Sequence, residues 1–187
     1  MAKRNKRNQK SLFRQRDGYM RHSERGTKII IKSMSRIKKI GLVILVVFIA
    51  IQFIQPARNE SGQVLPIDIS KIYNIPAPVQ SVLKNACYDC HSNHTNYPWY
   101  TYVQPVGWML ARHIKNGKAE LNFSEFGSYS IRKQKNKLNS IVNSLNDETM
   151  PLSSYTLIHK NARLTKDEKA IIIDWAEKTK DSLSLKN

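Results

Sequence analysis

The sequence predicts a small all-α domain that follows a single apolar helix near the N-terminus. Three observations lead to this prediction. One block, residues 40–54, is almost uniformly apolar. Four later segments repeat apolar residues at the three- and four-residue spacing of an amphipathic helix. No segment alternates apolar and polar residues over a length that would predict a β-strand.

The positive charge of the chain is concentrated near its N-terminus. The formal net charge is +17, and residues 1–39 alone hold 14 Lys and Arg against two acidic residues. Residues 1–28 have too few apolar side chains to form a core, so a disordered basic tail is predicted over residues 1–39. A solvated cytoplasmic tail is favoured over an arm that binds nucleic acid or anionic lipid. Met34 opens a stretch with the form of a complete membrane-targeted start, which makes it an alternative first residue.

Residues 40–56 are predicted to form a transmembrane anchor. The 15 residues 40–54 would extend about 22 Å as a helix, which is short for a hydrocarbon core of about 30 Å. The following residues lack the small-residue pattern of a cleavage site, so an uncleaved anchor is favoured over a signal peptide. Lys38 and Lys39 precede the block. The positive-inside tendency then places the N-terminus in the cytoplasm and the remainder in the periplasm, at a bacterial inner membrane.

The remainder of the chain divides into a linker and a domain. Residues 57–75 contain turn formers without a sustained period, which predicts a linker. The domain is expected over residues 76–182, with a tail at 183–187. Its four helices are expected within residues 76–91, 105–117, 130–145 and 164–178. The last of them begins with Thr165 and Glu168, a capping-box pair.

The stretch ACYDCHSNH contains both cysteines of the chain, Cys87 and Cys90, followed directly by His91. A thioredoxin-like redox pair needs a βαβ context, which is not predicted, and a zinc site needs four ligands where only His94 is near. The spacing is typical of a c-type haem site, because one helical turn sets two thiols at the separation of two vinyl groups and places the histidine under the iron. The sequence therefore predicts one covalently bound haem c with His91 as an axial ligand.

Haem iron in an electron carrier usually has a second protein ligand. Met150 is the favoured candidate, because it lies between two predicted helices beside Pro151 and serves no helical core face. His113 is the alternative, since it follows Met109 and Leu110 on an apolar stripe and would face inward. Met109 itself is expected in the core. A gap-filling role for Met150 and a hydrogen-bonded core role for His113 are the competing interpretations.

Aromatic side chains are concentrated in the stretch NYPWYTYVQP. A haem has a large apolar face, so Tyr97, Trp99 and Tyr100 are expected to line its pocket or to join the core. Stacking on nucleic acid is disfavoured because the neighbouring sequence is not basic. The basic run within residues 132–137 predicts a solvated helix face, with docking of an acidic redox partner as the alternative.

Several motifs resemble those of the bacterial haem-binding domain family, namely CYDCHSN, YPWY, LNFSEF and MPLSSYTLIH. Its members are short proteins with a membrane anchor and one CxxCH motif. The resemblance covers roughly residues 40–180 and leaves out residues 1–33. It implies a cytochrome c-like helical domain with covalent haem at Cys87 and Cys90, ligation by His91, and Met150 in the place of the Met-Pro ligand of small class I c-type cytochromes.

These observations together predict a membrane-anchored monohaem cytochrome that is an electron carrier and not an enzyme. Its redox partners, in the membrane or the periplasm, are not identified by the sequence. Two alternatives belong to other classes. With an open sixth iron position, the protein would sense a gas or a peroxide, and peroxidase-like activity would be compatible with it. Without haem, it would be a basic membrane-tethered interaction module that acts through its N-terminal arm.

Overall fold

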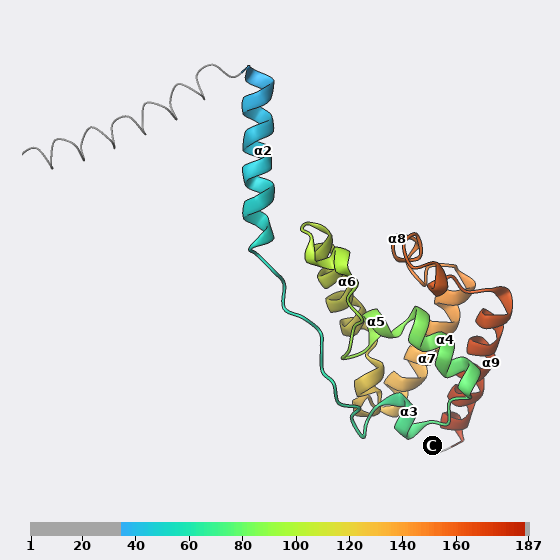
Figure 1. Ribbon diagram of the computed structural model, residues 1–187. Helices are drawn as coiled ribbons and strands as arrows, with labels where there is room; N and C mark the ends of the chain where they lie inside the picture. The colour runs from blue at the N-terminus through green and yellow to red at the C-terminus, as the bar shows by residue number, and fades with distance from the viewer. Residues whose placement is uncertain (1–34, 186–187) are drawn as a thin grey trace, which may run out of the picture. The chain divides into compact units, whose positions relative to one another are not determined.

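The computed structural model describes residues 35–185 of the chain (Figure 1). The chain forms two compact units that divide between Ile54 and Gln55. Within residues 35–185 the regular elements are helical, and β pairing is limited to an isolated bridge between Glu60 and His94. The predicted all-α class is therefore confirmed for this part of the chain. The predictions of a disordered tail and of a start at Met34 concern residues outside it, apart from residues 35–39.

Helix α2 (Arg36–Gln52) is the described helix of the first unit, and it begins earlier than the predicted apolar anchor. Ser35 caps it by accepting a hydrogen bond from the Lys38 backbone amide at 3.4 Å. None of its side chains is buried. The predicted transmembrane helix at residues 40–56 is not found, because α2 has 17 residues and no helix between residues 35 and 185 is long and apolar enough to cross a membrane.

The segment expected to be a linker, residues 57–75, is part of the second unit. The side chain of Asp68 accepts a hydrogen bond from the Ser70 amide at 2.9 Å and thereby caps the short helix α3 (Ile69–Ile72). Ile69 is fully buried in the hydrophobic core. At the start of the same segment, the Arg58 guanidinium lies over the rings of Tyr97 and Tyr102. A single buried isoleucine leaves no periodic pattern in the sequence, which is why these residues were expected to lie outside the domain.

All four predicted helices of the domain are present. They are α4 (Ala77–Ala86), α6 (Val106–Glu120), α7 (Ile131–Asn146) and α9 (Lys166–Ser184). Short helical elements connect them: α5 (Tyr88–His91), η1 (Trp99–Tyr102), η2 (Phe123–Ser128), α8 (Ser153–Thr156) and η3 (Lys160–Ala162). The capping box of Thr165 and Glu168 is confirmed, with the Thr165 amide donating to the Glu168 carboxylate at 2.8 Å.

The core lies where α9 packs against α7 and α4 (Figure 1). Phe123 and Phe126 of η2 are also almost completely buried there. Two expectations differ from this packing. Met109 is 50% exposed, because the buried face of α6 carries Gly107 and Ile114 instead. Helix α9 continues to Ser184 and enters the predicted tail, because Leu183 is buried on the same face as the core residues before it.

Helix α6 runs through Gly117, where the sequence predicted its end, and this glycine allows a close contact with α5. A Cβ atom added at Gly117 would lie 2.7 Å from the carbonyl oxygen of Cys90 and 3.3 Å from its Cβ atom. The first of these distances is too short for any side chain without a backbone shift. The absence of a side chain at this position therefore lets α6 pass directly beside the turn that carries the two cysteines.

We expect Gly117→Ala to lower the free energy of unfolding by about 1–2 kcal/mol. Overpacking costs about 1–3 kcal/mol, and the better helix propensity of alanine offsets at most about 1 kcal/mol of it. Urea unfolding followed by circular dichroism measures the difference. Gly62→Ala is the matched control, because an added Cβ there meets nothing within 4 Å. Equal unfolding midpoints for the two variants would contradict the close contact.

Candidate functional site

The two cysteines and His91 lie on a single helical turn. The backbone amides of Cys90 and His91 donate to the carbonyl oxygen of Cys87 at 3.2 and 3.0 Å. Both thiols are free, and both cysteines are half-buried. The spacing that suggested a helical turn in the sequence thus forms one, and it places all three side chains on α5 and its N-terminal cap.

One ring nitrogen of His91 forms a hydrogen bond with the backbone. Its Nδ1 atom lies 3.0 Å from the carbonyl oxygen of Leu121, at the end of α6. A carbonyl only accepts hydrogen bonds, so the proton is on Nδ1 and the lone pair is on Nε2. Burial lowers the pKa of His91 and outweighs the carbonyls of Leu121 and Gly117, which act in the opposite direction. A neutral imidazole with a fixed tautomer is the form that binds a metal.

Two cavities adjoin this turn, with volumes of about 250 and 350 Å³. They share part of their walls, because His91, Met150 and Pro151 line both. Cys87 borders the smaller cavity and Cys90 the larger one. The smaller cavity has apolar wall residues, Leu83, Leu121, Phe123, Ile141, Leu145 and Ile172, and polar ones, Glu120, Lys137, Ser140 and Ser144. The walls of the larger cavity include polar residues: His113, Asn116 and Tyr155.

Met150 lies in the loop between α7 and α8, as predicted, and is 36% exposed. The amides of Thr149 and Met150 both donate to the carbonyl oxygen of Ser144, at 3.0 and 3.3 Å, which fixes the loop on the end of α7. The alternative ligand, His113, is half-buried and lines the larger cavity only. The structure therefore brings both candidates to the site, and Met150 shares more of its wall with His91.

The residue types around the two cavities fit a haem. One histidine nitrogen and one methionine sulfur are available as iron ligands, and one thiol stands beside each half of the space. The aliphatic side chains and Phe123 supply the apolar surface that a porphyrin needs. Within residues 35–185 no group of three or more His, Cys, Asp and Glu side chains is placed so that it could hold a metal ion.

The aromatic residues expected in the haem pocket or in the core do not border the two cavities. Tyr97, Trp99 and Tyr100 line neither cavity. Trp99 is 79% exposed, and the Tyr97 hydroxyl accepts a hydrogen bond from the Asn59 amide at 2.9 Å. The aromatic wall residues are instead Phe123 and Tyr155. Sequence reasoning gave these two no role of their own, although they belong to the LNFSEF and MPLSSYTLIH motifs.

Burial keeps both thiols protonated at neutral pH. It raises the pKa of Cys87 to about 12, with a smaller contribution from the charge of Cys90. It likewise raises the pKa of Cys90 to about 11, assisted by the neighbouring Asp89. A catalytic redox pair needs a thiolate and therefore a lowered pKa. The environment of these cysteines consequently disfavours disulfide exchange and favours an apolar binding partner.

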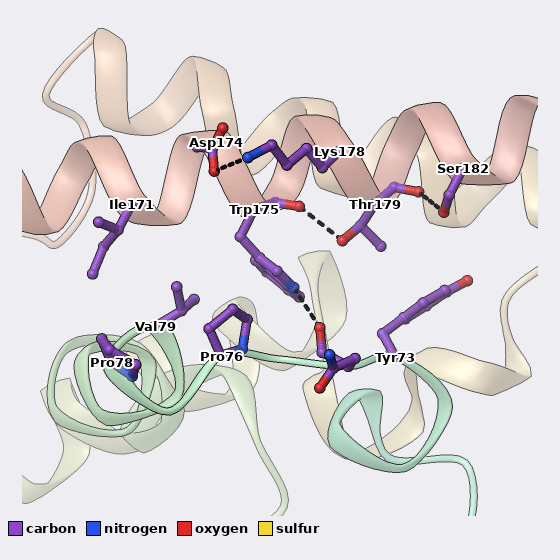
Figure 2. Close-up of a pocket in the computed structure, with 11 residues that line it drawn as sticks. Tyr73, Pro76, Pro78, Val79, Ile171, Asp174, Trp175, Lys178, Thr179 and Ser182 are labelled. Atoms are coloured by element: carbon purple, nitrogen blue, oxygen red, sulfur yellow. Dashed lines mark hydrogen bonds and ion pairs between the residues drawn. The ribbon is translucent and has the colours of Figure 1, made fainter.

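A wider groove of about 500 Å³ lies between α9 and residues 73–79 (Figure 2). Its polar side chains are paired with near neighbours: Trp175 Nε1 donates to the Asn74 carbonyl at 3.2 Å, and Lys178 pairs with Asp174 at 2.8 Å. None of the predicted ligands or cysteines lines it. The larger volume therefore does not mark the functional site.

Comparison with known proteins gives one match. Residues 46–178 match the family model described as the haem-binding domain, which covers most of the chain and includes both cavities. No curated protein and no solved structure matches the chain.

We expect the thiols of the haem-free folded protein to react with iodoacetamide at pH 8 about a hundredfold more slowly than those of the urea-unfolded chain. At pKa values of about 11 and 12, the thiolate is a very small fraction at pH 8, whereas an ordinary cysteine has a pKa near 8.5. Deprotonation increases with pH, so the folded rate should rise about tenfold per pH unit up to pH 10. Similar rates for folded and unfolded protein at pH 8 would support a reactive redox pair instead.

Proposed function

Because the chain belongs to the haem-binding domain family, we propose that this haem-binding protein is a monohaem c-type cytochrome that carries single electrons. The observation that supports this most directly is the meeting of the two cavities at His91 and Met150, with Cys87 and Cys90 on the same turn. The residues for covalent attachment and for two axial ligands are thus gathered around these two adjoining cavities.

The attachment step requires the two thiols to reach the two vinyl groups of one porphyrin. Cys87 and Cys90 border different cavities, and they lie three residues apart on the same turn, formed by α5 and its N-terminal cap. Thioether formation adds each S–H across a vinyl double bond, so it consumes the thiols and requires no oxidant. Removal of both cysteines would leave only the axial ligands and the apolar walls to hold the group.

Backbone carbonyls at the ends of α6 and α7 hold the two residues that would bind the iron. Leu121 orients His91 so that Nε2 carries the lone pair, and Ser144 fixes the backbone at Met150. If His91 and Met150 both bind the iron, no coordination position is left open for a substrate. This coordination suits an electron carrier more than an enzyme. When bound, the haem supplies the one-electron redox chemistry, and a thioether ligand raises its potential relative to a second imidazole.

The cellular location is also part of the proposal. Covalent attachment of haem takes place on the outer side of the bacterial inner membrane, so we place the domain in the periplasm. Helix α2 supports an association with that membrane, because its apolar side chains are exposed and Arg36, Lys38 and Lys39 precede them. Redox partners would then be membrane or periplasmic proteins.

We expect the full chain, produced in a host that matures c-type haem, to show a low-spin spectrum whose colour resists denaturation and acid–organic extraction. The ferric protein should show the weak methionine–iron charge-transfer band, and Met150→Ala should abolish it. His113→Ala is the matched control, because this residue borders the same cavity and is expected to keep the band. Absorption spectra of the ferric and ferrous forms measure each of these outcomes.

The opposite results have distinct meanings. Loss of the low-spin signature in His113→Ala, with Met150→Ala unchanged, would make His113 the second ligand. Covalent haem with a high-spin iron that binds carbon monoxide in the wild type would support a sensor. A colourless chain would contradict the haem proposal altogether.

A further inference from the structure

A direct hydrogen bond connects the loop of Met150 with the cysteine-bearing turn. The hydroxyl of Tyr155, on α8, donates to Oδ2 of Asp89 at 2.6 Å. Asp89 lies between Cys87 and Cys90, and Tyr155 lines the larger cavity together with Met150. This contact thus joins the two segments from which the proposed axial ligands come.

Both partners of this hydrogen bond are held in place by other contacts. The Tyr155 ring stacks on the His159 ring, with centroids 4.1 Å apart and planes 13° from parallel. His159 in turn pairs through Nε2 with the hydroxyl of Tyr100. On the other side, Oδ1 of Asp89 accepts from the amide of Asn96 at 3.0 Å. The Tyr155–Asp89 pair is therefore a rigid link, and burial raises the pKa of Tyr155 so that the hydroxyl remains a donor.

The position of Met150 depends on attachments at both sides of its loop. On the N-terminal side, the amides of Thr149 and Met150 bind the Ser144 carbonyl of α7. On the C-terminal side, the hydroxyl of Tyr155 binds Asp89. The first attachment places the loop on α7, and the second places it against the turn that carries His91.

We propose that Tyr155 is a positioning residue for the second iron ligand, because its hydrogen bond to Asp89 holds the Met150 loop against the haem-attachment turn. The proposal rests on the proposed function, in which Met150 is that ligand. Tyr155 does not touch the iron, and it acts by keeping the loop closed.

The consequence is measurable as competition for the iron. An added ligand such as imidazole binds a His/Met haem only after the methionine has left, so its affinity reports the free energy of opening the loop. Loss of a hydrogen bond to a charged group should shift the equilibrium between the closed and the open loop by about a factor of ten. Loss of the Tyr155 hydroxyl should therefore raise the affinity for imidazole by about tenfold.

The test uses the full-length ferric holoprotein and titrates imidazole by absorption. We expect Tyr155→Phe to bind imidazole about tenfold more tightly than the wild type. Tyr73→Phe is the matched control, because it also removes a hydroxyl that donates to a side chain, Gln134, without bordering either cavity. Its imidazole affinity should stay within about twofold of the wild type, even where its urea midpoint falls as much as that of Tyr155→Phe.

A double-mutant cycle assigns the effect to this pair of residues. In the Asp89→Ala background, Tyr155→Phe should produce no further gain in imidazole affinity, because the hydrogen bond is already lost. An equal gain in both backgrounds would overturn the proposal, since Tyr155 would then act independently of Asp89.

The Met150→Ala variant separates this proposal from the proposed function. If Met150→Ala binds imidazole much more tightly than the wild type while Tyr155→Phe does not, Met150 is the ligand and the positioning role is overturned. If Met150→Ala changes neither the charge-transfer band nor the imidazole affinity, the His/Met coordination itself fails, and the positioning role fails with it.

Discussion

The close passage of α6 beside the turn from Cys87 to His91 is the constraint on which the site depends. Gly117 makes this passage sterically possible, because any Cβ atom there would collide with the Cys90 carbonyl. One turn further along α6, the Leu121 carbonyl then meets Nδ1 of His91. A histidine that follows a CxxC pair has no preferred tautomer by itself. The helix that packs against it decides which nitrogen can bind a metal.

The chain after this turn is fastened by a polar network from residues that are distant in sequence. The side-chain amide of Asn59 donates to the carbonyl of Ser92 and to Oγ1 of Thr95, each at 2.9 Å. Lys118 of α6 donates to Asn59 Oδ1 at 2.7 Å, so the same asparagine also reaches the helix that orients His91. Hydrogen bonds of this kind stabilise a fold most strongly where they are shielded from water. The segment expected to be a linker thus helps to support the functional turn.

Both cavities of the site combine apolar walls with a few polar side chains. The smaller cavity is bounded by side chains of the hydrophobic core and, on its polar part, by Glu120, Lys137, Ser140 and Ser144. The larger cavity is bounded by His113, Asn116 and Tyr155, which offer hydrogen-bonding groups. Burial and hydrogen bonding near the iron are the means by which a protein adjusts a haem potential. Lys137 and Glu120 form an ion pair 3.6 Å apart. This pair contributes little to the stability of the fold, because Glu120 is exposed to solvent.

The sequence by itself determined the class of fold and the identity of the central residues. Helical periodicity located α4, α6, α7 and α9, because each buries one regular face, and the CxxCH spacing located the turn, because local geometry relates those residues. Local pattern could not reveal contacts between distant segments. Only the tertiary structure showed that Tyr97, Trp99 and Tyr100 lie away from the cavities, that Ile69 belongs to the core, and that Tyr155 reaches Asp89. These positions depend on how helices pack across long sequence separations, which no spacing within one segment encodes.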